Sequence, residues 1–134
     1  MAFSQHGAYK LWVVDRTVFA ELTGAWNLEA AKNFKKDFIS SADSLGDQWA
    51  HLVYLKDWEF CGKEVFPEIE SLVAWCIENG LKRTANVYPK SSLKNQFLGE
   101  MVVEEQGEFI RRIFDDPEQA SEWLSQEGYP TRIE

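Results

Sequence analysis

The chain has 134 residues, of which 45% are hydrophobic and 14% aromatic, and its 14 basic and 22 acidic side chains give a formal net charge of −8. This length and composition predict one folded domain and exclude a disordered chain, because the apolar residues are sufficient for a core. The acidic balance argues against binding to nucleic acid or to anionic membrane surfaces, since the few cations hardly cluster.

No stretch approaches the ~18 apolar residues of a membrane span, and the first residues lack the pattern of a secretory signal. The two cysteines, Cys61 and Cys76, give no disulfide framework, so a cytoplasmic location is expected. The two histidines, His6 and His51, have no ligand spacing to each other or to a cysteine. We therefore expect no metal or other cofactor and interpret both histidines as structural.

The first elements indicate a β-hairpin followed by a helix. Residues 9–15 and 17–24 flank a tight turn at Asp15-Arg16, and the second of these segments alternates between two faces. Gly24 is expected to end the second strand. Asn27 is a favourable N-cap for a helix over 28–42.

Residues 49–55 are nearly continuously apolar, which is typical of a central strand covered on both faces. A polar and aromatic loop over 57–66 follows, and then a helix over 66–79. Pro67 fits only the first turn of that helix, and Gly80 supplies its stop.

The last part of the chain alternates strands and helices again. Asp116 is expected to cap the final helix, with Pro117 at its first position and Gly128 at its end. The elements before it are a strand over 83–89, a short helix starting at Ser91 or Ser92, a turn over 105–109 and a strand over 109–114.

The predicted order of elements is therefore ββαβαβαβα. It indicates a single α/β domain with a central mixed, mostly parallel sheet of about five strands. The first strand is expected to be antiparallel at an edge, with helices on both faces.

Three segments carry a resemblance to a known family: ELTGAWNLEAAKNF, HLVYLKDWEFCGKEVFPEIE and RIFDDPEQASEWL. From about Tyr9 to Trp123 the chain resembles the SpoIIAA-like (STAS) family, in particular the branch compared with lipid-transfer domains of the CRAL-TRIO type. In the anti-sigma-factor antagonists of that family, the loop after the central strand carries a phosphorylated serine in an Asp-Ser-Ser-Gly type motif. The matching stretch here is Glu59-Phe60-Cys61-Gly62. Because a thiol does not accept phosphate from a serine kinase, the loop is expected to act as a contact surface without that switch.

The candidate binding site is this loop with the start of the following helix. Its residues are Asp57, Trp58, Glu59, Phe60, Cys61, Gly62 and Phe66. The expected function is a non-catalytic binding or regulatory module that recognises a protein partner through residues 57–70. The alternative is binding of a small apolar or lipid ligand in a cleft between helices and sheet.

Catalysis is not expected, because the sequence shows no nucleophile–base pair, metal cluster or phosphate-binding glycine loop. Cys61 lies near a helix N-terminus, but the acids around it oppose formation of a thiolate, and Cys76 is expected in the core. Trp58 has two interpretations: an exposed ring that marks a binding surface, or a ring that caps the core with Phe60.

Charge and edge pairing suggest two kinds of partner. Five acidic side chains are expected to form a solvated rim that would favour a basic protein partner: Asp57, Glu59, Glu64, Glu68 and Glu70. Leu11, Trp12, Val13 and Val14 alternate onto both faces of the edge strand, so a weak two-fold homodimer through this edge or its sheet face is also expected. By strand and helix position, four tryptophans are expected to face inward: Trp12, Trp49, Trp75 and Trp123.

Overall fold

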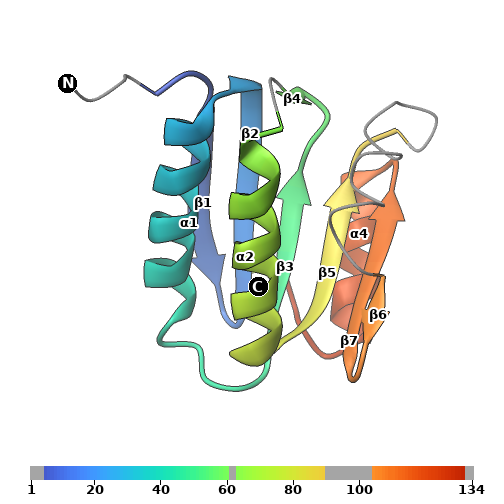
Figure 1. Cartoon of the computed structure of the whole chain (residues 1–134). Coiled ribbons are helices and arrows are strands. Elements are labelled where there is room, and N and C mark those ends of the chain that lie inside the picture. The colour runs from blue at the N-terminus through green and yellow to red at the C-terminus, as the bar shows by residue number, and fades with distance from the viewer. Residues whose placement is uncertain (1–4, 61–62, 90–103, 132–134) are drawn as a thin grey trace.

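Two helices cover one face of a central sheet, and a third lies on its other face (Figure 1). The computed structural model describes residues 5–60, 63–89 and 104–131. Helices α1 (Leu28–Ala42) and α2 (Val65–Glu78) pack side by side on the front face, and α4 (Pro117–Gln126) lies behind. The predicted short helix starting at Ser91 or Ser92 lies outside the described residues.

The sheet is mixed, with strands in the order β1-β2-β3-β5-β7-β6, and β4 pairs with β2 away from this path. β1 is antiparallel to β2 at one edge, β6 is antiparallel to β7 at the other, and the remaining pairs are parallel. The strands in the described part of the chain are β1 (Ala8–Val14), β2 (Thr17–Trp26), β3 (Trp49–Tyr54), β4 (Trp58–Phe60), β5 (Leu81–Val87), β6 (Glu105–Gln106) and β7 (Phe109–Phe114). The predicted α/β class, mixed sheet and antiparallel edge strand are confirmed.

Two short strands correct the prediction. β4 lies in the segment expected to be a loop, and β6 lies in the segment expected to be a turn. Strands of two or three residues are too short to show a period of two. Each is held by pairing with a distant or following strand, which the local sequence does not show.

Gly24 does not end β2, as was expected. It has φ of 78°, a left-handed conformation that glycine adopts without steric cost, and the strand continues to Trp26. Beyond Gly24 the new partner is β4, and the Gly24 amide donates a hydrogen bond to the Asp57 carbonyl at 2.9 Å.

Helix caps follow the sequence closely. The Asn27 side chain accepts a hydrogen bond from the Ala30 amide at 3.1 Å, and α1 has the predicted bounds. The Asp116 side chain accepts from the Glu118 amide at 2.9 Å, with Pro117 in the first turn of α4. Both helix starts were therefore predictable from local signals alone.

The core has two parts, one on each face of the sheet. The larger lies under α1 and α2 and contains Trp26, Phe38, Trp49 and Trp58, and the smaller lies under α4. Cys76 belongs to the larger cluster, as predicted.

Trp12 was expected to face inward but is 39% exposed. Its ring stacks on Phe19, with centroids 5.3 Å apart, on the face of the sheet that carries α4. α4 packs mainly on β3, β5 and β7, so it leaves this part of β1 and β2 uncovered. The alternation of the sequence places Trp12 on the correct face of β1, but the helix α4 that covers this face is narrower than the sheet.

Two glycines that follow helices offer a matched test of packing. Gly80 (φ 108°) follows α2 and Gly128 (φ 98°) follows α4, so alanine is strained by a similar backbone conformation at both. A Cβ at Gly80 would lie 2.7 Å from Asp47 backbone atoms, whereas a Cβ at Gly128 would meet nothing within 4 Å. We expect Gly80→Ala to lower the free energy of unfolding by about 1–3 kcal/mol more than Gly128→Ala, measured by urea denaturation. Equal losses would contradict this packing.

Candidate functional site

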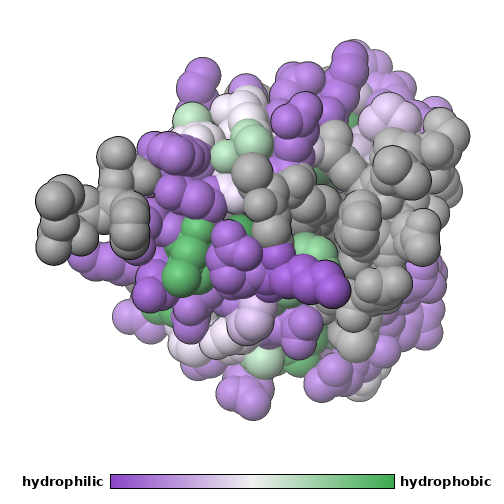
Figure 2. All heavy atoms as spheres, turned by 45° about the horizontal axis from the view of Figure 1, so that its top comes forward, coloured by the Kyte–Doolittle hydropathy of each residue, from purple (hydrophilic) through white to green (hydrophobic). Residues whose placement is uncertain are grey.

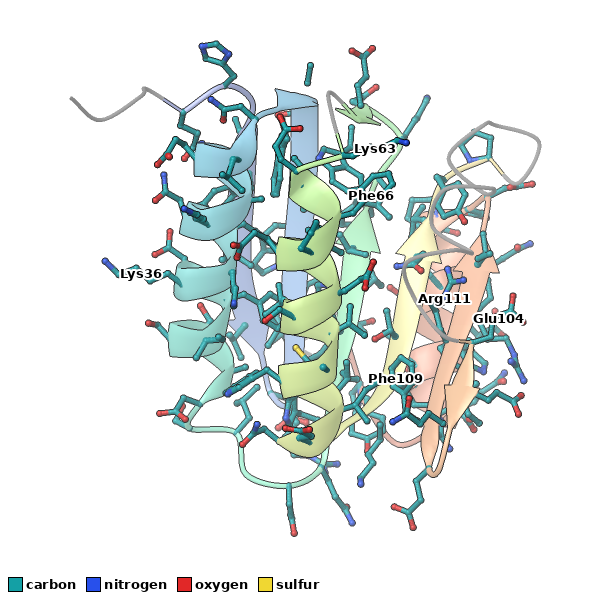
Figure 3. All side chains as sticks on the ribbon, viewed as in Figure 1. Lys36, Lys63, Phe66, Glu104, Phe109 and Arg111 are labelled. Atoms are coloured by element: carbon teal, nitrogen blue, oxygen red, sulfur yellow. The ribbon has the colours of Figure 1, made fainter. Side chains whose placement is uncertain are left out.

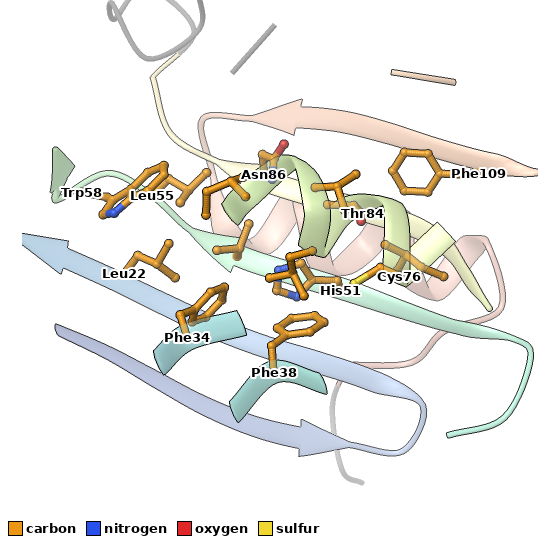
Figure 4. A pocket seen from close by; sticks show the side chains of 15 residues that line it. Leu22, Phe34, Phe38, His51, Leu55, Trp58, Cys76, Thr84, Asn86 and Phe109 are labelled. Carbon is orange, nitrogen blue, oxygen red and sulfur yellow. The ribbon is translucent and has the colours of Figure 1, made fainter. Parts of the chain in front are cut away.

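A cavity of about 90 Å³ lies between the front helices and the sheet. The side chains of 15 residues line it, most of them apolar (Figure 4). Phe38 comes from α1, Leu72 and Cys76 come from α2, and Trp58 and Phe109 lie toward opposite ends of the group. The cavity can therefore accept an apolar group between two layers of the fold.

Three polar side chains interrupt this apolar lining: His51 from β3, and Thr84 and Asn86 from β5. His51 and Thr84 are direct partners in the pairing of β3 with β5, so their side chains share a face of the sheet. Thr84 and Asn86 are two residues apart on one strand and share the same face. The polar groups thus form a compact set under α2.

His51 is held as a neutral side chain. Its Nδ1 lies 2.7 Å from the Val18 carbonyl oxygen, which can only accept, so Nδ1 carries the proton and Nε2 is an acceptor. The Phe38 ring meets the imidazole edge-on, with centroids 4.7 Å apart. Burial lowers the pKa of His51 to about 4, against the smaller opposing effect of the Val18 carbonyl.

The residues predicted as a binding site separate into two groups. Trp58 is 1% exposed and lines the cavity, so the structure shows the interpretation in which its ring caps the core. Phe66 is half-buried against the same core, whereas Asp57 and Glu59 are exposed. The Phe60 side chain, Cys61 and Gly62 lie outside the described residues.

The expected acidic rim is mixed in charge. Glu64 and Glu70 are exposed, but Glu68 is half-buried and forms an ion pair with Lys35 at 3.6 Å. The exposed Lys63 lies at the same end of the molecule, near the start of α2 (Figure 3). Figure 2, in which this end comes forward, shows mainly hydrophilic side chains with small hydrophobic areas between them.

Within residues 5–60, 63–89 and 104–131, no group of three or more His, Cys, Asp or Glu side chains could hold a metal ion. In the same residues, no helix is long and apolar enough to cross a membrane.

Sequence reasoning missed Thr84 and Asn86, and it treated His51 only as structural. A local signal exists for His51, because it interrupts an otherwise apolar strand. The sequence of β5, LKRTANV, mixes polar and apolar residues, so nothing local distinguishes Thr84 and Asn86. Only the pairing register shows that the polar residues of the two strands meet.

The neutral, half-buried His51 side chain predicts a specific pH dependence of stability. Because its pKa falls from 6.5 when unfolded to about 4 when folded, the unfolded chain binds more protons between these pH values. Stability is then fully present above pH 6.5 and falls as the pH is lowered toward 4, by about 3 kcal/mol in total.

We expect His51→Gln to remove this part of the pH dependence, measured as the difference in urea midpoint between pH 7 and pH 5. The exposed His6 provides the control, since His6→Gln should keep the wild-type dependence. An unchanged slope in His51→Gln would show that His51 is not buried in the neutral form.

Comparison with known proteins adds information about the fold. No protein-family model matches the chain, and no curated protein matches it. A solved structure does: an uncharacterised protein of the DUF3478 family with a SpoIIAA-like fold, from Shewanella loihica PV-4. The match has a TM-score of 0.67 at 12% identity and covers 92% of this chain and 98% of the other. The chain therefore has a SpoIIAA-like fold, and the predicted resemblance is confirmed at the level of the fold.

Proposed function

We propose that this protein is a non-catalytic binding module that holds a small apolar ligand in the cavity between α1, α2 and the sheet. The observation that carries the proposal is the apolar lining that extends from Trp58 toward Phe109 (Figure 4). The ligand would contact residues of both layers, and Trp58, from the segment that the sequence singled out, would contact it directly.

The energetic cost of the cavity supports this proposal. Protein interiors are close-packed, and an empty apolar volume costs about 24 cal/mol per Å³. A cavity of about 90 Å³ thus costs about 2 kcal/mol. An apolar ligand that fills it would recover part of this free energy.

The side chains of the cavity do not favour covalent chemistry. Burial raises the pKa of the Cys76 thiol, which keeps it protonated and a weak nucleophile. His51 lines the same cavity, but its hydrogen bond goes to Val18. Among the described residues no hydrogen bond joins His51 to Cys76, so the pairing that activates a cysteine nucleophile is not formed there.

A regulatory role through a protein partner is the second candidate. It is favoured by the exposure of Asp57 and Glu59 on either side of the buried Trp58. A partner could bind these charged side chains while Trp58 keeps the segment fixed to the core. Native mass spectrometry of freshly purified protein separates the two candidates. An apolar molecule that co-purifies supports the first, and a clean apo mass with capture of a basic protein supports the second.

Two substitutions at Cys76 test the cavity in opposite directions. Cys76→Leu adds side-chain volume next to the cavity, whereas Cys76→Ala removes it. We expect Cys76→Leu to weaken binding of xenon, an apolar probe smaller than benzene, by about 10-fold or more, and Cys76→Ala to keep it. Thermal unfolding of both variants controls for loss of structure. Xenon binding that is absent in the wild type, or equal in the two folded variants, would contradict the proposed function.

The expected homodimer stays a prediction. Trp12 and Val13, at 39% and 41% exposure, are large exposed hydrophobic side chains on the edge strand β1. Because an edge strand can pair with a second copy of itself, we expect sedimentation equilibrium at tens of micromolar to show a weak dimer that Trp12→Lys dissociates. Lys36 points away from α1 into solvent (Figure 3), so Lys36→Ala serves as the control. A monomer mass for the wild type at both low and high salt would refute the dimer.

A further inference from the structure

The polar residues of the cavity continue onto β7 as a row across three strands. Thr84 is paired with His51 on one side and with Arg111 on the other. Directly paired residues of parallel strands share a face, so all three side chains lie on the face that carries α2. Figure 3 shows Arg111 beside β5 and β7 on this face.

Arg111 is a buried cation with neutral partners. It is 3% exposed, its Nη1 donates to Asn86 Oδ1 at 2.8 Å, and it also hydrogen-bonds with Tyr88. None of the ion pairs in the described part of the chain includes Arg111. A buried charge is costly unless it is paired, so the site is electrostatically suited to an anion.

Two buried polar atoms on directly paired residues have no hydrogen-bond partner: Arg111 Nε and Thr84 Oγ1. Thr84 is 6% exposed and lines the cavity, whereas Arg111 is not part of the lining and lies beside it on the next strand. Most buried polar groups in proteins are hydrogen-bonded, so two exceptions on paired residues indicate a missing partner. Both can donate a proton, so one acceptor group could satisfy both.

The charges around the row limit what this acceptor can be. Arg111 supplies one positive charge, while His51 is neutral and presents an acceptor at Nε2. The Glu104 carboxylate, which is exposed and acts on Tyr88, adds a negative charge nearby and further disfavours a highly charged anion. A single cation beside an apolar cavity matches a monoanion with an apolar body better than a dianion such as a phosphate monoester. Carboxylate oxygens also match the planar donor geometry of a guanidinium.

We propose that Arg111 and Thr84 bind the carboxylate of a short-chain monocarboxylic acid whose apolar chain enters the cavity. This inference rests on the proposed binding function and specifies its ligand class. The chain must be short, since the cavity of about 90 Å³ is smaller than the apolar cavities of about 150 Å³ that accept benzene. The carboxylate compensates the buried charge, and the chain occupies the apolar space.

Calorimetric titration of the full chain with butanoate and butanol tests the inference, because the two probes share chain length and differ in charge. We expect the wild type to bind butanoate about 10- to 100-fold more tightly than butanol, as for hydrogen bonds to charged groups. Inorganic phosphate is the third probe and is expected to bind more weakly than butanoate. Phosphate binding as tight as butanoate binding would overturn the assignment to a monocarboxylate.

Two variants that remove the donor groups locate the interaction. Arg111→Met is expected to remove the preference for butanoate and keep butanol binding, and Thr84→Val to weaken butanoate binding about 3- to 10-fold. If Arg111→Met does not fold, Thr84→Val and the wild-type probe comparison still decide the outcome. Equal binding of butanoate and butanol by the wild type would overturn this inference and leave the proposed function standing. Binding of neither probe, together with no xenon binding, would overturn both.

Discussion

Strand β2 pairs with three other strands, and the position of the cavity depends on this. Its first half lies between β1 and β3, and its last three residues pair with β4. The chain leaves β3 at Tyr54 and returns to β2 at Trp58, fixed by the hydrogen bond from Gly24 to Asp57. This return places the Trp58 ring edge-on to Trp26, with centroids 5.4 Å apart, and brings it to one end of the cavity.

The same pairing explains why a segment rich in aromatic and charged residues has two surfaces. In a strand, successive side chains point to opposite sides, so Trp58 is buried while its neighbours Asp57 and Glu59 face water. A ligand in the cavity would touch the buried side of this segment, and a protein partner would touch the exposed side. The two candidate functions therefore use opposite sides of the same segment and do not exclude each other physically.

The polar row formed by His51, Thr84 and Arg111 lowers the stability of the fold relative to apolar side chains at the same positions. Aliphatic side chains at these positions would fill the space and require no hydrogen bonds, and replacement of buried charges by well-packed apolar groups is often neutral or stabilising. The neutral acceptor Asn86 satisfies only part of the Arg111 guanidinium. Packing alone does not account for the row, which is why the proposed carboxylate ligand is placed there.

Much of the fold was predictable because its signals are local. Asn27 and Asp116 carry side chains that cap helix starts, and the apolar run of β3 marks a central strand. β4 and β6 were missed because their stability comes from pairing and not from their own sequence. Gly24 was misread for the same reason, since the pairing of β4 with the end of β2 is not visible locally.

The candidate site was harder to predict because it depends on register. The segment from Asp57 to Phe66 was found from its composition, but the cavity that Trp58 lines is formed by seven different elements. Nothing near Arg111 in sequence indicates that Thr84 lies beside it. Those two residues meet only after β5 and β7 pair in one particular register.

The exposed Trp12 ring and the incompletely hydrogen-bonded Arg111 lie on opposite faces of the sheet. Trp12 and Phe19 stack on the face that carries α4, whereas Val18, next to Phe19 in β2, faces the core under α1 and α2. A strand separates these environments by a single residue step, and close-packed side chains fill both layers. A second copy bound through Trp12 would therefore leave the cavity and Arg111 accessible to a ligand. Self-association through Trp12 and ligand binding are expected to be separable by mutation, because Trp12 and Arg111 lie on opposite faces of the sheet.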